Sequence, residues 1–340
     1  MPIANVLGVP HTYDLRSSAF PRASKNFEES EKSPETIVFV HGWLLSRHYW
    51  HPLMDALPDC QRLAYDMRGF GDSVEPLSTR SERKTRTIPL PPGQSWYPIA
   101  APHTNAYTNA YTNDSFSLAA YAQDLEAMLD SLALDRVWLM GHSLGGSVAL
   151  WAAYLFPERV KGVICLNAGG GIYIPKEFEK FRSAGQQMVK YRPSWLAKLP
   201  VLPRVFTRAM VHQPLALKWG QQRLQDFVCA DRAAAVGSLL ASTTEKEVLQ
   251  MPLLMGALTQ PVHFITATQD SIMPPRYVNY LASFHRDFEG DPLSMVSEIA
   301  ECGHMAMVEQ TEAVAACVKK VVERQRDRTS SQLAASANHV

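Results

Sequence analysis

The feature that most constrains the fold is a glycine-rich turn between an apolar run and a helical run. Residues 137–140 are apolar, Gly141-His142-Ser143-Leu144-Gly145-Gly146 follows, and residues 147–156 have the composition of a buried helix. A side chain at Gly141 or Gly145 would collide with neighbouring backbone in so sharp a strand-to-helix turn. The turn raises Ser143 above the edge of a sheet, beside the N–H groups that begin a helix. We therefore predict an α/β protein with a candidate nucleophile at Ser143.

The rest of the chain has the alternation that such a fold requires. Short apolar runs alternate with longer amphipathic segments, which is typical of a mostly parallel central sheet flanked by helices. We expect strands at 9–15, 37–40, 62–65, 137–140, 262–267 and 294–299, and helices at 48–57 and 118–132. A chain of 340 residues with 46% hydrophobic content suits one large domain with an insertion.

Two segments interrupt this alternation. Residues 75–114 are rich in Pro, Thr, Asn and Arg, which indicates a surface loop insertion; the alternative is a lid or partner-docking loop that uses Trp96 and Tyr97. Residues 172–254 are helical in pattern, are interrupted by prolines and lie between two core strands, so we predict a helical cap or lid. The core is then residues 1–171 and 255–325, and residues 326–340 are expected to be a flexible tail.

A serine nucleophile needs a base to take its proton and a carboxylate to orient that base. Asp270 follows the strand expected at 262–267, and His304 follows the strand expected at 294–299, so both fall in loops at the carboxyl edge of the sheet. The loop at 167–171 offers no rival carboxylate. We predict Ser143, Asp270 and His304 as the catalytic residues.

The oxyanion that forms during acyl transfer needs two hydrogen-bond donors. The backbone N–H of Leu144 is one candidate, because it begins the helix after the turn. The backbone N–H of Trp43 is the other, since it lies in the early loop after His41-Gly42. Trp43 and His142 are also candidates for substrate binding.

These segments resemble the α/β-hydrolase superfamily, in particular its esterase, lipase and haloperoxidase-like branch with a helical cap. The resemblance runs in order through His41-Gly42, the Asp66–Ser73 turn, the Ser143 turn, the Asp270 loop and Gly303-His304 with Glu309. It implies an α/β-hydrolase fold and a serine-dependent carboxylic ester hydrolase that acts through an acyl-enzyme intermediate. It also implies no cofactor and no metal. Epoxide hydrolases and haloalkane dehalogenases of similar fold have aspartate where Ser143 stands. Asp66, Arg68 and Asp72 are expected to hold their turn together.

The same triad could serve other activities. A perhydrolase or cofactor-free haloperoxidase is one alternative, and an acyltransferase or thioesterase is another. A non-catalytic ligand-binding receptor that keeps the hydrolase shape is a third.

The predicted cap indicates the kind of partner. Its aromatic residues would either line a cavity for a small lipophilic ester or pack against the core; they are Phe178, Phe181, Tyr191, Trp195, Phe206, Trp219 and Phe227. From Gly171 to Met255 there are twelve Lys and Arg against six Asp and Glu, so transient membrane-surface contact through the cap is a hypothesis. The chain as a whole has 33 residues of each charge, and we expect no nucleic acid partner. The oligomeric state stays open.

Cysteine usage and hydropathy bear on location. The five cysteines are scattered without a CxxC pair, which favours free thiols in a reducing compartment over disulfides or a zinc site. No signal peptide or membrane span is visible in the sequence. We expect a cytoplasmic protein.

Overall fold

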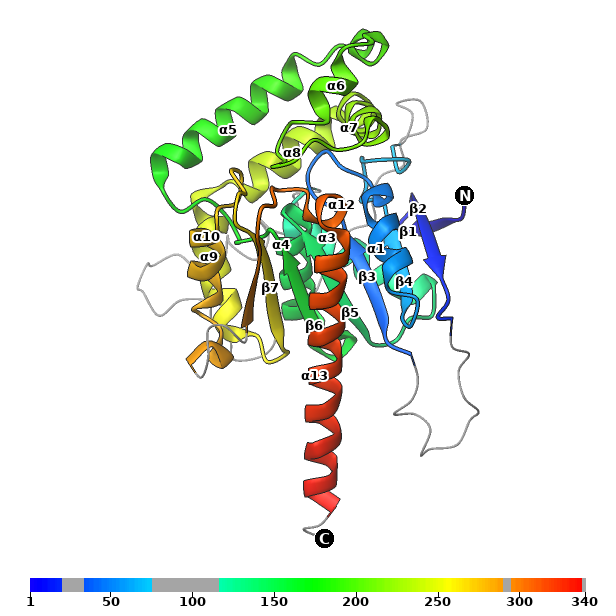
Figure 1. Cartoon of the computed structure of the whole chain (residues 1–340), viewed down its shortest axis with the longest axis vertical. Helices are drawn as coiled ribbons and strands as arrows, with labels where there is room; N and C mark the ends of the chain where they lie inside the picture. Colours follow the sequence, from blue (N-terminus) through cyan, green and yellow to red (C-terminus); the bar gives the residue numbers. More distant parts are fainter. Residues whose placement is uncertain (20–33, 75–115, 290–294, 338–340) are drawn as a thin grey trace.

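The computed structural model describes residues 1–19, 34–74, 116–289 and 295–337 (Figure 1). The predicted surface loop at 75–114, with Trp96 and Tyr97, lies outside the described residues.

The described residues form an eight-stranded sheet with the order β1-β2-β4-β3-β5-β6-β7-β8. The strands are β1 Ile3–Val6, β2 Val9–Arg16, β3 Thr36–Val40, β4 Gln61–Tyr65, β5 Val137–His142, β6 Val160–Leu166, β7 Val262–Ala267 and β8 Val296–Ile299. The β1–β2 and β2–β4 pairs are antiparallel, and every pair from β4 to β8 is parallel. This confirms the predicted mostly parallel α/β sheet. The short strand β1 was not predicted, and the predicted strands did not include β6.

Helices cover both faces of the sheet, which is why its strands are apolar at consecutive positions. On one face, Val38 and Leu139 pack with the layer of α3 Leu118–Ser131, α4 Leu144–Leu155, α9 Glu245–Ala257 and α10 Pro275–Ala282. On the other face, Phe39 and Trp138 pack with α1 His51–Ala56, α12 Ala306–Glu309 and α13 Thr311–Ala337. Figure 1 shows α1, α12 and α13 in front of the sheet. Short 3-10 turns occupy η2 Arg47–Trp50, η4 Pro157–Arg159 and η6 Arg286–Glu289.

Helices inserted between β6 and β7 lie beyond the carboxyl end of the sheet, at the top of Figure 1. They are α5 Pro175–Lys190, η5 Ser194–Lys198, α6 Leu202–Phe206, α7 Leu217–Cys229 and α8 Arg232–Ser242. The helix that follows, α9, contacts α4 and α10, and Trp151 Nε1 of α4 donates a hydrogen bond to Glu247 Oε1 of α9. We therefore propose that the cap ends before α9, and that the last residues of the predicted 172–254 segment cover the sheet.

The C-terminal helix differs from the expectation for the end of the chain. Residues 326–337, which were expected to be a flexible tail, continue α13 without a break, and this part of the helix extends below the sheet in Figure 1. The sequence Glu-Arg-Gln-Arg-Asp-Arg at 323–328 consists mostly of good helix formers. Ser331 Oγ also donates a hydrogen bond to the backbone carbonyl of Asp327 at 2.8 Å. The polar composition of residues 326–337 was therefore not a sign that the helix ends before them.

Candidate active site

The predicted site residues lie at one edge of the sheet, most of them in loops, with His142 at the end of β5 and Leu144 at the start of α4. The loop with Trp43 follows β3, Ser143 follows β5, Asp270 follows β7 and His304 follows β8. These strands are parallel neighbours or linked through β6, so their carboxyl ends meet at one edge. In open α/β sheets this edge is where ligands bind.

Ser143 occupies a strained backbone conformation. Its φ of 52° and ψ of −120° are unfavourable for a residue with a side chain. Its N–H donates to the carbonyl of Leu166 at 3.0 Å, which fixes the turn to β6. A Cβ at Gly141 would lie 2.2 Å from the carbonyl oxygen of Gly145, and a Cβ at Gly145 would lie 2.2 Å from the carbonyl oxygen of Val40. The close approach of these backbone segments is what requires glycine on both sides of the serine.

Asp270 and His304 form a buried pair. His304 Nδ1 lies 2.7 Å from Asp270 Oδ2, and the Asp270 side chain is fully buried. Asp270 Oδ1 accepts hydrogen bonds from the N–H groups of Ile272 at 2.8 Å and Met273 at 2.9 Å. Burial opposes ionisation, but His304 and the two N–H groups more than offset it, so the pKa of the Asp270 carboxyl is lowered. A stable carboxylate therefore faces Nδ1 of His304 and leaves Nε2 as the nitrogen that can act as a base.

The serine and the histidine are near each other without a direct hydrogen bond. The rings of His142, the neighbour of Ser143, and His304 have centroids 4.7 Å apart. Within the described ranges, no hydrogen bond joins Ser143 Oγ to His304 Nε2. Catalytic hydrogen bonds of this kind often tighten only when substrate is bound.

His142, a candidate for substrate contact, has a different position. Its side chain is completely buried, and it does not line the pocket beside Ser143. Burial and the neighbouring His304 lower the pKa of His142 to about 3, so its ring is neutral. Its Nε2 donates to the backbone carbonyl of His304 at 2.7 Å. Substrate binding by His142 stays a prediction that this position does not support, because strand β5 places the side chain in the protein interior against His304.

Three further contacts hold the loop of His304. Asn167 Nδ2 donates to the carbonyl of Gly303 at 2.9 Å, and the N–H of Gly303 donates to Glu309 Oε1 at 2.6 Å. The N–H of His304 donates to the carbonyl of Met210, in the inserted segment, at 2.8 Å. Of these partners only Glu309 was marked by a sequence pattern, the Gly-His-x4-Glu spacing. No local signal in the sequence points to the contacts of Asn167 and Met210.

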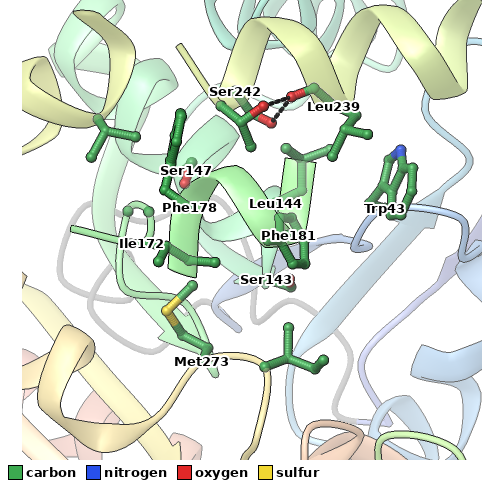
Figure 2. Close-up of a pocket in the computed structure, with 15 residues that line it drawn as sticks. Trp43, Ser143, Leu144, Ser147, Ile172, Phe178, Phe181, Leu239, Ser242 and Met273 are labelled. Carbon is green, nitrogen blue, oxygen red and sulfur yellow. Dashed lines mark hydrogen bonds between the residues drawn. The ribbon is translucent and has the colours of Figure 1, made fainter. Parts of the chain in front are cut away.

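A pocket extends from Ser143 toward the inserted helices. Figure 2 shows Ser143 between Trp43 on one side and Ile172 and Met273 on the other. The remaining lining residues are Leu144, Ser147, Gly170, Gly171, Phe178, Phe181, Leu239, Ser242, Thr243, Val248 and Ile272. The pocket has a volume of about 80 Å³. Its walls are mostly apolar, and Trp43 is anchored by a hydrogen bond from Nε1 to the carbonyl of Ala235 at 2.9 Å.

The two candidate oxyanion donors border this pocket. Trp43 and Leu144 both line it next to Ser143, and a Cβ at Gly42 would lie 3.2 Å from Cβ of Ser143. Within the described part of the chain, neither the N–H of Trp43 nor that of Leu144 donates to another protein group. Two polar N–H groups are thus placed beside the serine without a protein acceptor.

The aromatic residues of the insertion divide into three groups. Phe178 and Phe181 of α5 line the pocket. Trp219 stacks on Tyr49 with ring centroids 5.6 Å apart, and Phe206 and Phe227 pair at 5.7 Å. Tyr191 and Trp195 are exposed to solvent. The two interpretations of this cluster, cavity lining and packing, each apply to part of it.

The turn after β4 is held together by hydrogen bonds and ion pairs, as expected from the sequence. Asp66 accepts hydrogen bonds from the N–H groups of Arg47 at 2.6 Å and Asp72 at 2.8 Å, and it pairs with the buried Arg47 guanidinium at 2.5 Å. Arg68 pairs with Asp124 of α3 at 3.0 Å. These contacts fix the loop after β3 against the turn.

No cluster of His, Cys, Asp and Glu in the described ranges could hold a metal ion, and all five cysteines are free thiols. None of the helices in these ranges has both the length and the apolar character needed to cross a bilayer.

Comparison with known proteins gives the family. The family model described as alpha/beta hydrolase fold matches residues 35–311, which contain the loop of Trp43, Ser143, Asp270 and His304. The chain belongs to the alpha/beta hydrolase fold family. Family membership confirms the predicted fold, while the hydrolase activity, the nucleophile and the substrate are proposals.

Individual relatives are more distant. A pimeloyl-[acyl-carrier protein] methyl ester esterase of Neisseria meningitidis is 24% identical over 313 residues, which cover 90% of this chain and 83% of that protein. An uncharacterised protein of Mycobacterium tuberculosis is 30% identical over 173 residues, 48% of this chain, and the match spans about half (51%) of that relative's length. The solved structure of a thermophilic esterase from Thermogutta terrifontis superposes with a TM-score of 0.63 at 18% identity, covering 96% of this chain and 100% of that one.

Proposed function

We propose that this protein is a serine-dependent carboxylic ester hydrolase that acts on a lipophilic ester through an acyl-enzyme intermediate. The observation that carries the proposal is the position of Ser143. It lies in a strained turn in the wall of an apolar pocket, between two unpaired N–H groups, at the sheet edge that holds the Asp270–His304 pair. The Neisseria relative, named as a methyl ester esterase, supports ester hydrolysis.

The first step in this proposal forms the acyl-enzyme. Ser143 Oγ attacks the ester carbonyl carbon while His304 Nε2 takes its proton. The N–H groups of Trp43 and Leu144 hydrogen-bond the oxyanion that forms. The bond to the alcohol oxygen then breaks, and His304 gives its proton to the leaving alcohol. Asp270, ionised because its pKa is lowered, stabilises the positively charged imidazole during this step.

The second step releases the acid. His304 takes a proton from water, and the resulting hydroxide attacks the acyl carbon. The bond to Ser143 Oγ breaks, and the serine recovers its proton from His304. The two steps together convert an ester and water to an acid and an alcohol, and every proton passes through His304.

The pocket supports an acyl group of limited length. The pocket beside Ser143 has a volume of only about 80 Å³, which limits the acyl group to a short chain. The walls from Ile172, Phe178 and Phe181 favour an apolar chain. We therefore expect butyrate and hexanoate esters to be better substrates than acetate or decanoate esters.

The test uses p-nitrophenyl esters of graded chain length and a fluorophosphonate probe. Ser143→Ala should abolish both hydrolysis and covalent labelling. Ser147→Ala is the matched control, because Ser147 lies one helical turn away and lines the same pocket. It should keep the labelling. Persistent labelling and hydrolysis in a folded Ser143→Ala variant would refute the assignment of the nucleophile.

A further inference from the structure

We propose that the outer surface of the cap, between α5 and α7, docks on an anionic lipid bilayer. The docking surface is defined by exposed apolar and aromatic side chains and by the cations among them. Its apolar members are Tyr191, Trp195, Leu199, Val201, Val205 and Leu217, and its cations are Lys190, Lys198, Arg204, Arg208 and Lys218.

The charge of this region is one-sided, in contrast to the balanced chain. Residues 180–225 contain nine Lys and Arg and no Asp or Glu, whereas the whole chain has 33 of each sign. Within the described residues, none of these nine cations takes part in an ion pair. No carboxylate of the described residues therefore neutralises this positive region.

Three of the nine cations donate hydrogen bonds to backbone carbonyls inside the cap and are not available to an external anion. Arg182 donates to carbonyls at the end of α8, Arg192 donates to those of Phe227 and Ala230, and Arg223 donates to those of Phe206 and Ala209. These three side chains tie the cap helices to one another. The five cations of the docking surface are exposed and make no such contact.

The exposed apolar side chains distinguish a bilayer from other anionic partners. Tyr191 is 68% exposed, Val201 61% and Trp195 56%, although large apolar residues are normally buried. They lie on η5 and in the turns on either side of it, in the part of the cap near α6, at the end of the molecule farthest from the C terminus (Figure 1). Tryptophan and tyrosine favour the boundary between lipid chains and headgroups, and neighbouring lysines and arginines attract anionic headgroups.

A groove in the same surface has the same mixed chemistry. It has a volume of about 470 Å³ and is lined by Leu199, Leu217 and Leu224 together with Lys198 and Arg204. Apolar walls beside two cations suit the region where an acyl chain meets an anionic headgroup. The groove is separate from the pocket of Ser143, with which it shares no lining residue.

The test is flotation of the full chain with vesicles of phosphatidylcholine alone and of phosphatidylcholine with phosphatidylglycerol. The protein should bind the anionic vesicles and not the neutral ones. Trp195→Ala with Val201→Ser should weaken binding about tenfold through lost apolar burial, and Lys198→Glu with Arg204→Glu should weaken it at least about tenfold through charge reversal. The control is Leu249→Ser with Lys319→Glu, which changes an exposed leucine and an exposed lysine elsewhere and should leave binding unchanged.

Two results would overturn the proposal. One is that the parent protein fails to bind anionic vesicles. The other is that charge reversal removes binding while the Trp195→Ala and Val201→Ser variant binds like the parent, which would indicate a purely electrostatic surface suited to an acidic protein. Hydrolysis of a dissolved p-nitrophenyl ester should be unchanged in both double variants, so a failure here is distinguishable from a failure of the proposed esterase activity.

Discussion

Replacing Asp270 with asparagine tests the proposed triad most sharply, because the structure dictates how the new side chain must sit. Oδ1 of Asp270 accepts from two backbone N–H groups, those of Ile272 and Met273. An asparagine must place its oxygen there, since its amino group would face two donors. The amino group then points at Nδ1 of His304, which has to become an acceptor.

This forced tautomer removes the base. With Nδ1 as the acceptor, the proton of a neutral His304 sits on Nε2, which can no longer accept the proton of Ser143. We expect kcat to fall about 10⁴-fold, which corresponds to about 5 kcal/mol of transition-state stabilisation. The assay is hydrolysis of p-nitrophenyl butyrate, with the melting temperature measured in parallel.

Asp66→Asn is the matched control for this experiment. Asp66 is also fully buried and also accepts two backbone N–H groups, but its third partner is Arg47, which has no alternative tautomer. This variant should lose stability without a comparable loss of kcat. A loss of less than tenfold in a folded Asp270→Asn variant would refute the reasoning and place the acid elsewhere.

Three further changes test the elbow, a buried carboxyl and the loop of the base. Gly145→Ala should lower the free energy of unfolding by about 2 kcal/mol and largely abolish hydrolysis, because the new Cβ would lie 2.2 Å from the carbonyl oxygen of Val40. The control is Gly256→Ala in α9, where the nearest atom to the new Cβ lies at 3.4 Å, so the melting temperature should stay unchanged or rise. Equal melting temperatures and activities of the two variants would contradict this steric explanation. Burial raises the pKa of Asp226 to about 7, so the folded protein keeps a proton on this carboxyl that the unfolded chain releases near pH 4. The free energy of unfolding should therefore fall by up to about 4 kcal/mol as the pH rises from about 4 to about 7. Asp226→Asn should lack this loss, so its melting temperature relative to the parent should be higher at pH 8 than at pH 5, and a constant difference would count against the raised pKa. Glu309→Ala should lower kcat about tenfold with little change in KM, because the N–H of Gly303 loses its acceptor. Glu309→Gln keeps an acceptor oxygen and should restore part of the lost kcat. Equal activity of the two variants would argue against a positioning role for Glu309.

The positions of the residues proposed as catalytic could be predicted because each is marked locally. Ser143, Asp270 and His304 lie within five residues of the ends of buried strands, and parallel strands bring their carboxyl ends to one edge whatever lies between them in the sequence. The requirement for glycine at position 141 is likewise local, because its Cβ would meet the backbone of Gly145 in the same turn, whereas a Cβ at Gly145 would meet the carbonyl oxygen of Val40 at the end of β3.

Other parts of the site could not be predicted, because they depend on contacts between distant segments. The carbonyl of Met210 holds the N–H of His304 across 94 residues, and a backbone carbonyl carries no sequence signal. The sequence also did not show that the ring of His142 packs against His304 in the interior, although its neighbour Ser143 lines the pocket. The amphipathic pattern of the cap did not separate Phe178, which lines the pocket, from Trp195, which faces solvent.

The hydrogen bond between Met210 and His304 bears on how this enzyme could be re-engineered. Exchanging the insertion between β6 and β7 for that of another relative is an obvious way to change the substrate. Here such a graft would also remove the Met210 carbonyl, which accepts the hydrogen bond of the His304 N–H. It would remove His212 as well, whose N–H donates to Glu309 Oε2 at 3.0 Å, while the N–H of Gly303 donates to Oε1 of the same carboxylate. The inserted segment thus contributes to the wall of the pocket and also holds the loop of His304. A chimaera should therefore keep residues 210–212 even when the rest of the cap is replaced.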